Sequence, residues 1–429
     1  TSMTRIKPKD GNSTFCMAPW THTYLSPQTE RRLCCASREP AQSFRQYIDT
    51  GNDANEYKPL TLKEHWNSEH MRSVRLRMMA GEELSECEVC THKLLNTDVY
   101  RSYWNQLFAD KIDEAYNSTD DTGATTMPTI SFDYRFNNLC NFKCRMCGDM
   151  LSSSWEAESR KQGTWNADTQ PWMASPLRER IKEFQDTQVV EEFLSAIESK
   201  TIKEIYWCGG EPLMWDIHWR AMQRIIELGF AKDVYVRYNT NLSRTSFKGI
   251  KLFDLLPQFQ DWQICASLDG TAEVGEYIRD GLNYAEWMNN FKEGLAVAKT
   301  SREMRLDYTL TLPGLLELKN MFDLSQELDA EILTKVMFTF SNDEILSPLS
   351  LPRELLHTII DEALAYMEPR ATRKQRALMD VLKNLKTRDT FTATPKGKQR
   401  QERIDAIRKQ DITNILSRDT RILAWWKNI

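Results

Sequence analysis

Three cysteines on one short stretch offer the most specific chemistry in the chain. Cys140, Cys144 and Cys147 lie in the string LCNFKCRMCGD, with the spacing C-x3-C-x2-C. Three thiolates on one tight loop can hold three irons of a cubane cluster and leave the fourth iron without a protein ligand. An open iron is a site for a small-molecule chelate. A structural zinc site is the alternative, but zinc needs four closed ligands, and the next cysteine along the chain is Cys208.

This loop needs a scaffold, and the flanking sequence predicts alternating strands and helices. The segment 127–140 has alternating apolar residues from Ile130 to Tyr134, which indicates a strand that leads into the cysteine loop. A helical period covers 218–230, with Gly229 in a C-cap role. Strands and helices that repeat at ~30-residue spacing favour parallel strands joined by right-handed crossovers. The further predicted strands lie within 203–215, 233–243, 261–281, 304–318 and 333–341.

The triplet CNFKCRMC resembles the signature of the radical S-adenosylmethionine (SAM) enzymes. In that family the open iron is chelated by the amino and carboxylate groups of SAM, and the reduced cluster cleaves SAM to methionine and a 5′-deoxyadenosyl radical. The string GGEP after the second strand is similar to the family motif that holds the SAM amino group, with a plain strand-to-helix turn as the less favoured alternative. The SAM contacts that the resemblance implies are Gly209, Gly210, Glu211, Pro212, Asn241, Ser267 and Arg279.

The resemblance covers roughly residues 126–345 and implies an α/β fold, a partial (β/α)6 TIM-like barrel. The matching motifs lie at predicted carboxyl ends of strands, where barrel enzymes place their sites. One departure is Met146, which stands where an aromatic residue often packs near adenine. We interpret Cys208 and Cys265 as buried strand thiols without chemistry.

The five cysteines before this core carry a second resemblance. The strings FCMAPW, LCCAS, HWNSEH and CEVC resemble a twitch or SPASM auxiliary-cluster domain, which usually follows the radical SAM core but here precedes it. The resemblance implies a second [4Fe–4S] cluster, closed to substrate and suited to electron transfer. A zinc knuckle is the alternative, because four closed thiolates also satisfy zinc. The implied ligands are Cys16, Cys34, Cys87 and Cys90, with Cys35 as the alternative to Cys34.

The segments between these cysteines predict a β-hairpin followed by an amphipathic helix. The helix has its apolar stripe on Trp66, Met71, Val74 and Met78. We predict four parts of the chain: the auxiliary domain at 1–115, a polar linker at 116–128, the partial barrel at 129–345 and a C-terminal basic helical segment at 346–429.

Composition sets the broad class. The 429 residues are 41% hydrophobic and 27% charged with a net charge of −5, which predicts a globular chain of two or three domains. No apolar run approaches the ~18 residues of a membrane span, and no apolar leader precedes the first cysteine, so we expect a cytoplasmic protein with reduced thiols. Residues 370–409 hold 13 Lys or Arg against 4 Asp or Glu, which favours a solvated helical face over a grip on RNA or an acidic peptide.

Together these features predict a radical SAM enzyme with SAM and two [4Fe–4S] clusters. The 5′-deoxyadenosyl radical would abstract a hydrogen atom from substrate, and the auxiliary cluster would assist electron transfer. The expected partners are a flavodoxin- or ferredoxin-like electron donor and a peptide or protein substrate, which would be oxidised, cross-linked or epimerised. The alternatives are modification of a nucleotide or RNA, or a non-catalytic iron–sulfur electron carrier or scaffold. No catalytic side chain that touches substrate is identified from the sequence.

Overall fold

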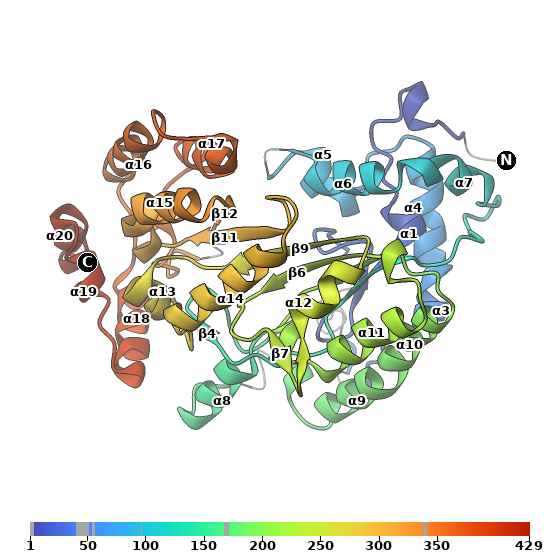
Figure 1. Ribbon diagram of the computed structural model, residues 1–429, viewed down its shortest axis with the longest axis horizontal. Coiled ribbons are helices and arrows are strands. Elements are labelled where there is room, and N and C mark those ends of the chain that lie inside the picture. The colour runs from blue at the N-terminus through green and yellow to red at the C-terminus, as the bar shows by residue number, and fades with distance from the viewer. Residues whose placement is uncertain (1–3, 40–50, 54–55, 96, 167–170, 338–340) are drawn as a thin grey trace. The chain divides into compact units, whose positions relative to one another are not determined.

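The chain forms an α/β fold around a mostly parallel sheet, as a computed structural model shows (Figure 1). The structure describes residues 4–39, 51–53, 56–95, 97–166, 171–337 and 341–429. The eight strands of the sheet are ordered β12-β11-β9-β6-β5-β3-β1-β2. Their bounds are β1 (His22–Leu25), β2 (Arg31–Arg32), β3 (Ser131–Tyr134), β5 (Glu204–Trp207), β6 (Tyr235–Thr240), β9 (Asp261–Ser267), β11 (Met304–Leu310) and β12 (Glu331–Val336).

The described chain divides into two compact units. The first unit comprises 1–138, 160–237 and 258–260, and the second comprises 139–159, 238–257 and 261–429. Strand β6 begins in the first unit and ends in the second. These units follow contacts in space, and the four parts drawn from the sequence stay predictions.

In the first unit the N-terminal segment contributes directly to the sheet. The predicted hairpin is confirmed, since β1 and β2 pair antiparallel with Tyr24 opposite Arg32. Strand β1 also pairs in parallel with β3, placing His22 opposite Ser131, and β3 pairs in parallel with β5. All four residues of β3 are buried, as expected for a strand with neighbours on both sides. The segment that carries the first cysteines is therefore built onto this part of the sheet.

The predicted amphipathic helix forms as two pieces, α3 (Leu62–Trp66) and α4 (Glu69–Met79). The break lies where the Ser68 side chain caps α4 by accepting a hydrogen bond from the Met71 backbone N–H, at 3.3 Å. The apolar stripe is confirmed, because Trp66, Met71, Val74 and Met78 are all buried.

The segment 116–128 is ordered and packs on this pair of helices. The indole Nε1–H of Trp66 donates to the carbonyl oxygen of Met127 at 2.9 Å. Gly123 has a φ of +90°, and a side chain there would collide with the Arg72 backbone. Only glycine suits this approach.

Helices cover the strands of the first unit where the sequence predicts them. They include α10 (Val190–Glu198) and α11 (Asp216–Glu227). Helix α11 is followed by Gly229 at φ +81°, which confirms the predicted C-terminal glycine.

In the second unit β9, β11 and β12 form a parallel set with Ser267 opposite Asp307 and Leu306 opposite Ile332. The strands predicted in these segments are confirmed, although residues 338–340 of the last one lie outside the described residues. The helices that accompany the strands are α13 (Ala272–Ile278), α14 (Tyr284–Val297) and α15 (Leu318–Leu328).

The C-terminal segment is helical, as predicted (Figure 1). Trp426 is 2% exposed and anchors the last helix. The five helices are α16 (Arg353–Met367), α17 (Arg376–Leu385), α18 (Pro395–Arg408), α19 (Thr413–Leu416) and α20 (Thr420–Lys427). No helix within the described ranges is both long and apolar enough to cross a membrane.

The prediction that Cys208 and Cys265 are buried strand thiols needs correction. Both are only partly buried, and Cys208 follows β5 instead of lying within it. Cys265 does lie in β9, on the face of that strand whose side chains are less buried.

Candidate functional site

The cysteine triplet lies on a loop of the second unit that is tied to a short ladder. Strand β4 (Lys143–Cys144) pairs antiparallel with β10 (Arg279–Asp280), and Cys144 is opposite Arg279. The backbone N–H of Cys147 donates to the carbonyl oxygen of Cys144 at 3.0 Å, so a tight turn carries the second and third thiols.

Three consecutive serines at the start of α8 (Ser153–Lys161) form hydrogen bonds with the backbone of the cysteine loop. Ser152 Oγ donates to the carbonyl oxygen of Phe142 at 2.5 Å, and Ser154 Oγ donates to that of Cys140 at 2.7 Å. Ser153 Oγ accepts from the Cys140 N–H at 3.0 Å. The sequence reasoning missed these residues, although a Ser-Ser-Ser-Trp run just before a helix is a recognisable capping signal.

Arg279 lies against the thiol of Cys144. Its Nη1 lies 3.5 Å from Cys144 Sγ, and its Nε donates to the Asp269 carboxylate at 2.6 Å. Asp269 is fully buried and also accepts from the Thr309 N–H at 2.9 Å. Asp269 therefore fixes Arg279 beside the loop, as well as shaping its own turn.

Burial favours the protonated form of two thiols of this loop, those of Cys144 and Cys147. Burial raises the pKa of Cys144 to about 12, against the opposing charge of Arg279. Burial also raises the pKa of Cys147. Metal loading must displace these protons, as it does at thiolate sites in general.

Asn241 and Ser267, two of the implied SAM contacts, lie in the same unit as the triplet. Asn241 Nδ2 donates to Asn141 Oδ1 at 3.0 Å and lies 3.9 Å from Cys140 Sγ. Ser267 ends β9 and is 9% exposed. The structure therefore brings Asn241 and Arg279 to the cysteine loop.

The Gly209–Pro212 motif belongs to the first unit and follows β5. Gly209 has a φ of +131°, and a Cβ there would lie 3.0 Å from the Trp215 ring and 3.1 Å from Arg135 Cβ. Glu211 is 1% exposed, and one of its carboxylate oxygens accepts from the Leu213 N–H at 3.0 Å. The motif thus forms a strand-to-helix turn in which Glu211 caps the turn that follows.

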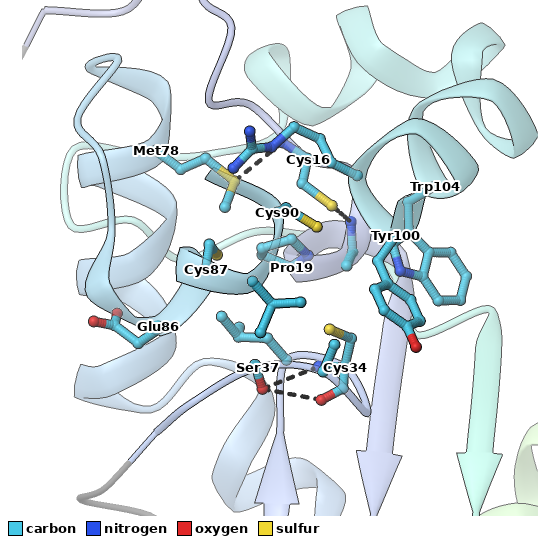
Figure 2. Close-up of a pocket in the computed structure, with 15 residues that line it drawn as sticks. Cys16, Pro19, Cys34, Ser37, Met78, Glu86, Cys87, Cys90, Tyr100 and Trp104 are labelled. Atoms are coloured by element: carbon cyan, nitrogen blue, oxygen red, sulfur yellow. Dashed lines mark hydrogen bonds between the residues drawn. The ribbon is translucent and has the colours of Figure 1, made fainter. Parts of the chain in front are cut away.

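Four of the five N-terminal cysteines line one pocket in the first unit (Figure 2). They come from the segment before α1 (Ala18–Thr21), the loop after β2, the 3₁₀ turn Ser85–Cys87 and the short helix α5 (Glu88–Thr91). The pocket has an empty volume of about 400 Å³, open solvent at its mouth included. The four thiols belong to Cys16, Cys34, Cys87 and Cys90.

Local contacts hold these cysteines in place. The Cys16 N–H donates to Met78 Sδ at 3.3 Å, and Cys16 Sγ accepts from the Ala18 N–H at 3.5 Å. Ser37 Oγ donates to the carbonyl oxygen of Cys34 at 2.9 Å. A backbone N–H aimed at a cysteine sulfur is a common partner of iron–sulfur ligands, because it stabilises the thiolate.

Burial dominates the electrostatics of the pocket. It raises the pKa of Cys87 to about 12 and raises the pKa values of Cys16 and Cys34 as well. The guanidinium of Arg101, which also lines the pocket, opposes this rise at Cys16 and Cys87. One positive charge therefore faces the thiols and would offset part of the charge of a thiolate-bound metal centre.

Cys35 is absent from the pocket lining, although it lies close enough to raise the pKa of Tyr100, which does line the pocket. Burial raises the pKa of Cys35 to about 11, with the charge of Asp133 adding to the rise. The adjacent cysteines thus face different surroundings.

In number and kind of donor, three thiols on one loop and four around one pocket fit the ligand sets of iron–sulfur clusters. Across the residues the structure describes, no group of three or more His, Cys, Asp or Glu side chains converges closely enough to hold one metal ion. The four N-terminal thiols instead surround a pocket.

Comparison with known proteins gives only distant similarity. No family model and no curated protein matches the chain. Similar solved structures include native anSMEcpe, an anaerobic sulfatase-maturating enzyme, with bound AdoMet and Cp18Cys peptide, and native anSMEcpe with bound AdoMet. Each has a TM-score of 0.36 and 13% identity, over 55% and 56% of this chain. The chain spans 58% and 60% of the length of those structures.

Proposed function

We propose that the protein is a radical SAM enzyme with a second, closed [4Fe–4S] cluster. The observation that carries the proposal is the division of its thiols into a set of three on one held loop and a set of four around one pocket. Three thiols leave one iron open and four leave none, which suits one cluster for SAM and one for electron transfer.

In the proposed SAM site Cys140, Cys144 and Cys147 hold the first cluster. When bound, this cluster supplies the electron that cleaves SAM and so provides the radical that abstracts hydrogen from substrate. Arg279 lies beside Cys144 and is oriented by buried Asp269, so its remaining N–H groups would face the cluster and the SAM carboxylate. Asn241 lies next to Cys140. Its side-chain N–H would donate a hydrogen bond to SAM in place of the one it donates to Asn141. The further SAM contacts that we propose are Ser267 and Gly209, Gly210, Glu211 and Pro212.

The second cluster would be held by Cys16, Cys34, Cys87 and Cys90. Four ligands close it to substrate, so its use is to take up or pass on an electron. The Ala18 N–H and the Arg101 guanidinium would stabilise negative charge at this site. An auxiliary domain of the twitch or SPASM type placed before a partial barrel is part of this proposal.

We further propose a peptide or protein substrate and a flavodoxin- or ferredoxin-like donor in a cytoplasmic setting. The substrate class rests on the twitch and SPASM resemblance. The rival, RNA modification, would use the basic C-terminal segment. Part of that charge is already paired within the second unit, for example in Lys374–Asp329 at 2.6 Å and Arg408–Glu158 at 3.1 Å.

Metal analysis after anaerobic reconstitution tests the two-cluster proposal. We expect about eight irons and about eight sulfides per chain, with no zinc. Replacing Cys140, Cys144 and Cys147 by alanine should remove about half of the iron, and so should replacing Cys87 and Cys90. About four irons with one zinc per chain would overturn the second cluster and favour a zinc knuckle.

A further inference from the structure

A basic helix of the C-terminal segment contacts the cysteine loop directly. Arg145, between the second and third cysteines, has a side chain with no exposed surface. Its Nη2 lies 2.7 Å from Asp405 Oδ1 in α18 and donates to Gln410 Oε1 at 2.5 Å. Its guanidinium also lies 4.1 Å from the centre of the Tyr277 ring. One charged residue of the loop is thus enclosed by the C-terminal segment and α13.

Asp405 is itself fixed on several sides. It is 5% exposed, accepts from the Tyr277 hydroxyl at 2.9 Å and accepts from the Ile412 N–H at 2.9 Å. Arg145 Nη1 also lies 3.4 Å from Gln401 Oε1, whereas its buried Nε has no hydrogen-bond partner among the residues described. Removing one partner of a buried ion pair leaves an uncompensated charge. The pair of Arg145 and Asp405 is therefore a rigid link between the loop and α18.

A second link lies at the end of α18. Arg408 Nη1 donates to the carbonyl oxygen of Lys143 at 2.9 Å, which bonds the helix to the backbone of β4. Arg408 also makes a two-pronged contact with Glu158, at 3.2 and 3.1 Å, and lies 4.4 Å from the centre of the Trp155 ring. Its side chain is only 2% exposed.

We propose that α18 is part of the SAM-cluster site: Arg145 and Arg408 act as positioning residues that hold Cys144 and Cys147 in the arrangement that accepts the cluster. The inference rests on the proposed function and assigns a role to the basic segment. The loop is then held on one edge by β10 and on the other by α18, which Figure 1 shows beside α13. One of the basic residues that suggested a nucleic-acid grip, Arg408, would then help to hold the cysteine loop.

The test compares Asp405→Asn and Arg408→Gln with Arg403→Gln, an exposed residue of the same helix. Each full-length protein is reconstituted anaerobically, and its iron and sulfide are counted. The reduced protein is then examined by EPR with and without SAM. We expect Asp405→Asn and Arg408→Gln to lose up to half of the iron and the SAM-induced change of the EPR signal. Arg403→Gln should keep both, and Arg408→Lys should restore part of what Arg408→Gln loses.

Full iron and an unchanged SAM response in both Asp405→Asn and Arg408→Gln would overturn the proposal. Should Asp405→Asn be insoluble, Arg408→Gln decides, because it leaves the buried pair of Arg145 and Asp405 in place. A different result would show that the proposed function itself is wrong. In that case the wild-type protein and its Cys140→Ala, Cys144→Ala, Cys147→Ala variant would contain the same amount of iron. Loss of the second cluster along with the first in the α18 variants would point to general unfolding and also contradict the inference.

Discussion

Gly281 sets how closely the cysteine loop approaches the chain after Arg279. It has a φ of +112°, and a Cβ at this position would lie 2.7 Å from the Phe142 ring and 2.9 Å from the Asn141 carbonyl oxygen. Real Cβ atoms do not come so close to backbone, so any side chain would push the loop between Cys140 and Cys144 away.

We therefore predict that Gly281→Ala loses the first cluster. The matched control is Gly249→Ala, because Gly249 has a similar φ of +83° but nothing within 4 Å of its added Cβ. Both variants carry the conformational cost of a positive φ, roughly 1 kcal/mol of unfolding free energy. Only Gly281→Ala should also lose about four irons per chain. Equal iron contents in the two variants would show that the loop tolerates the side chain.

The adjacent cysteines Cys34 and Cys35 provide a second comparison at this scale. Cys34 lines the pocket with the other three thiols, whereas Cys35 does not line it. Cys34→Ala should lose the second cluster and about four irons per chain, while Cys35→Ala should keep them. Iron analysis and visible absorbance of the reconstituted proteins decide, and the reverse pattern would make Cys35 the ligand.

At the scale of elements, the short helix α3 carries a buried histidine that lowers the free energy of unfolding at acidic pH. His65 is 1% exposed, and neither ring nitrogen has a hydrogen-bond partner among the residues described. Burial lowers its pKa from 6.5 to about 3. Between these values the unfolded chain binds a proton that the folded chain does not, so the free energy of unfolding falls as the pH falls below 6.5.

Between pH 7 and pH 5 this histidine should lower the free energy of unfolding by about 2 kcal/mol. Urea unfolding of the metal-free wild type and of His65→Leu at both pH values measures it. The variant should show a smaller loss of stability on acidification by about that amount, and its apolar side chain also removes an unsatisfied buried group. An identical pH dependence in the two proteins would mean that His65 is protonated, or hydrated, in the folded state.

Local patterns predicted most elements, because periods of two and 3.6 residues reflect which side chains are buried. The strands β3, β5, β6, β9 and β11 lie inside the predicted segments, and the apolar stripe of α4 is buried. The parallel pairing of β1 with β3 was not predicted, since His22 and Ser131 are far apart in sequence and a hairpin pattern reports only its own turn. The enclosure of Arg145 by α18 escaped prediction for the same reason.

At the scale of the whole molecule, each thiol set lies within one compact unit. The triplet belongs to the second unit and the four-thiol pocket to the first. The motif resemblances implied which thiols belong to each set, and the ligation of each set stays a prediction. The cysteine spacing could not predict the side chains around each thiol set, such as Arg101 at the pocket and Asp269, which pairs with Arg279.

The net charge of −5 is unevenly distributed along the chain. Residues 370–409 carry a charge of +9, so the rest of the chain carries −14. Ion pairs such as Arg145–Asp405, Arg408–Glu158 and Lys386–Asp361 show that opposite charges are matched inside the second unit. The basic segment is thus in part a structural element of the fold.

The central claim is that the chain binds SAM at a three-cysteine cluster and cleaves it. The most direct measurement is the yield of 5′-deoxyadenosine after anaerobic incubation of the reconstituted protein with SAM and dithionite. We predict that the product forms with the wild type and with Cys34→Ala, and is lost when Cys140, Cys144 and Cys147 are replaced by alanine. Absence of 5′-deoxyadenosine from wild-type protein that holds both clusters would contradict the claim and leave an iron–sulfur electron carrier or scaffold.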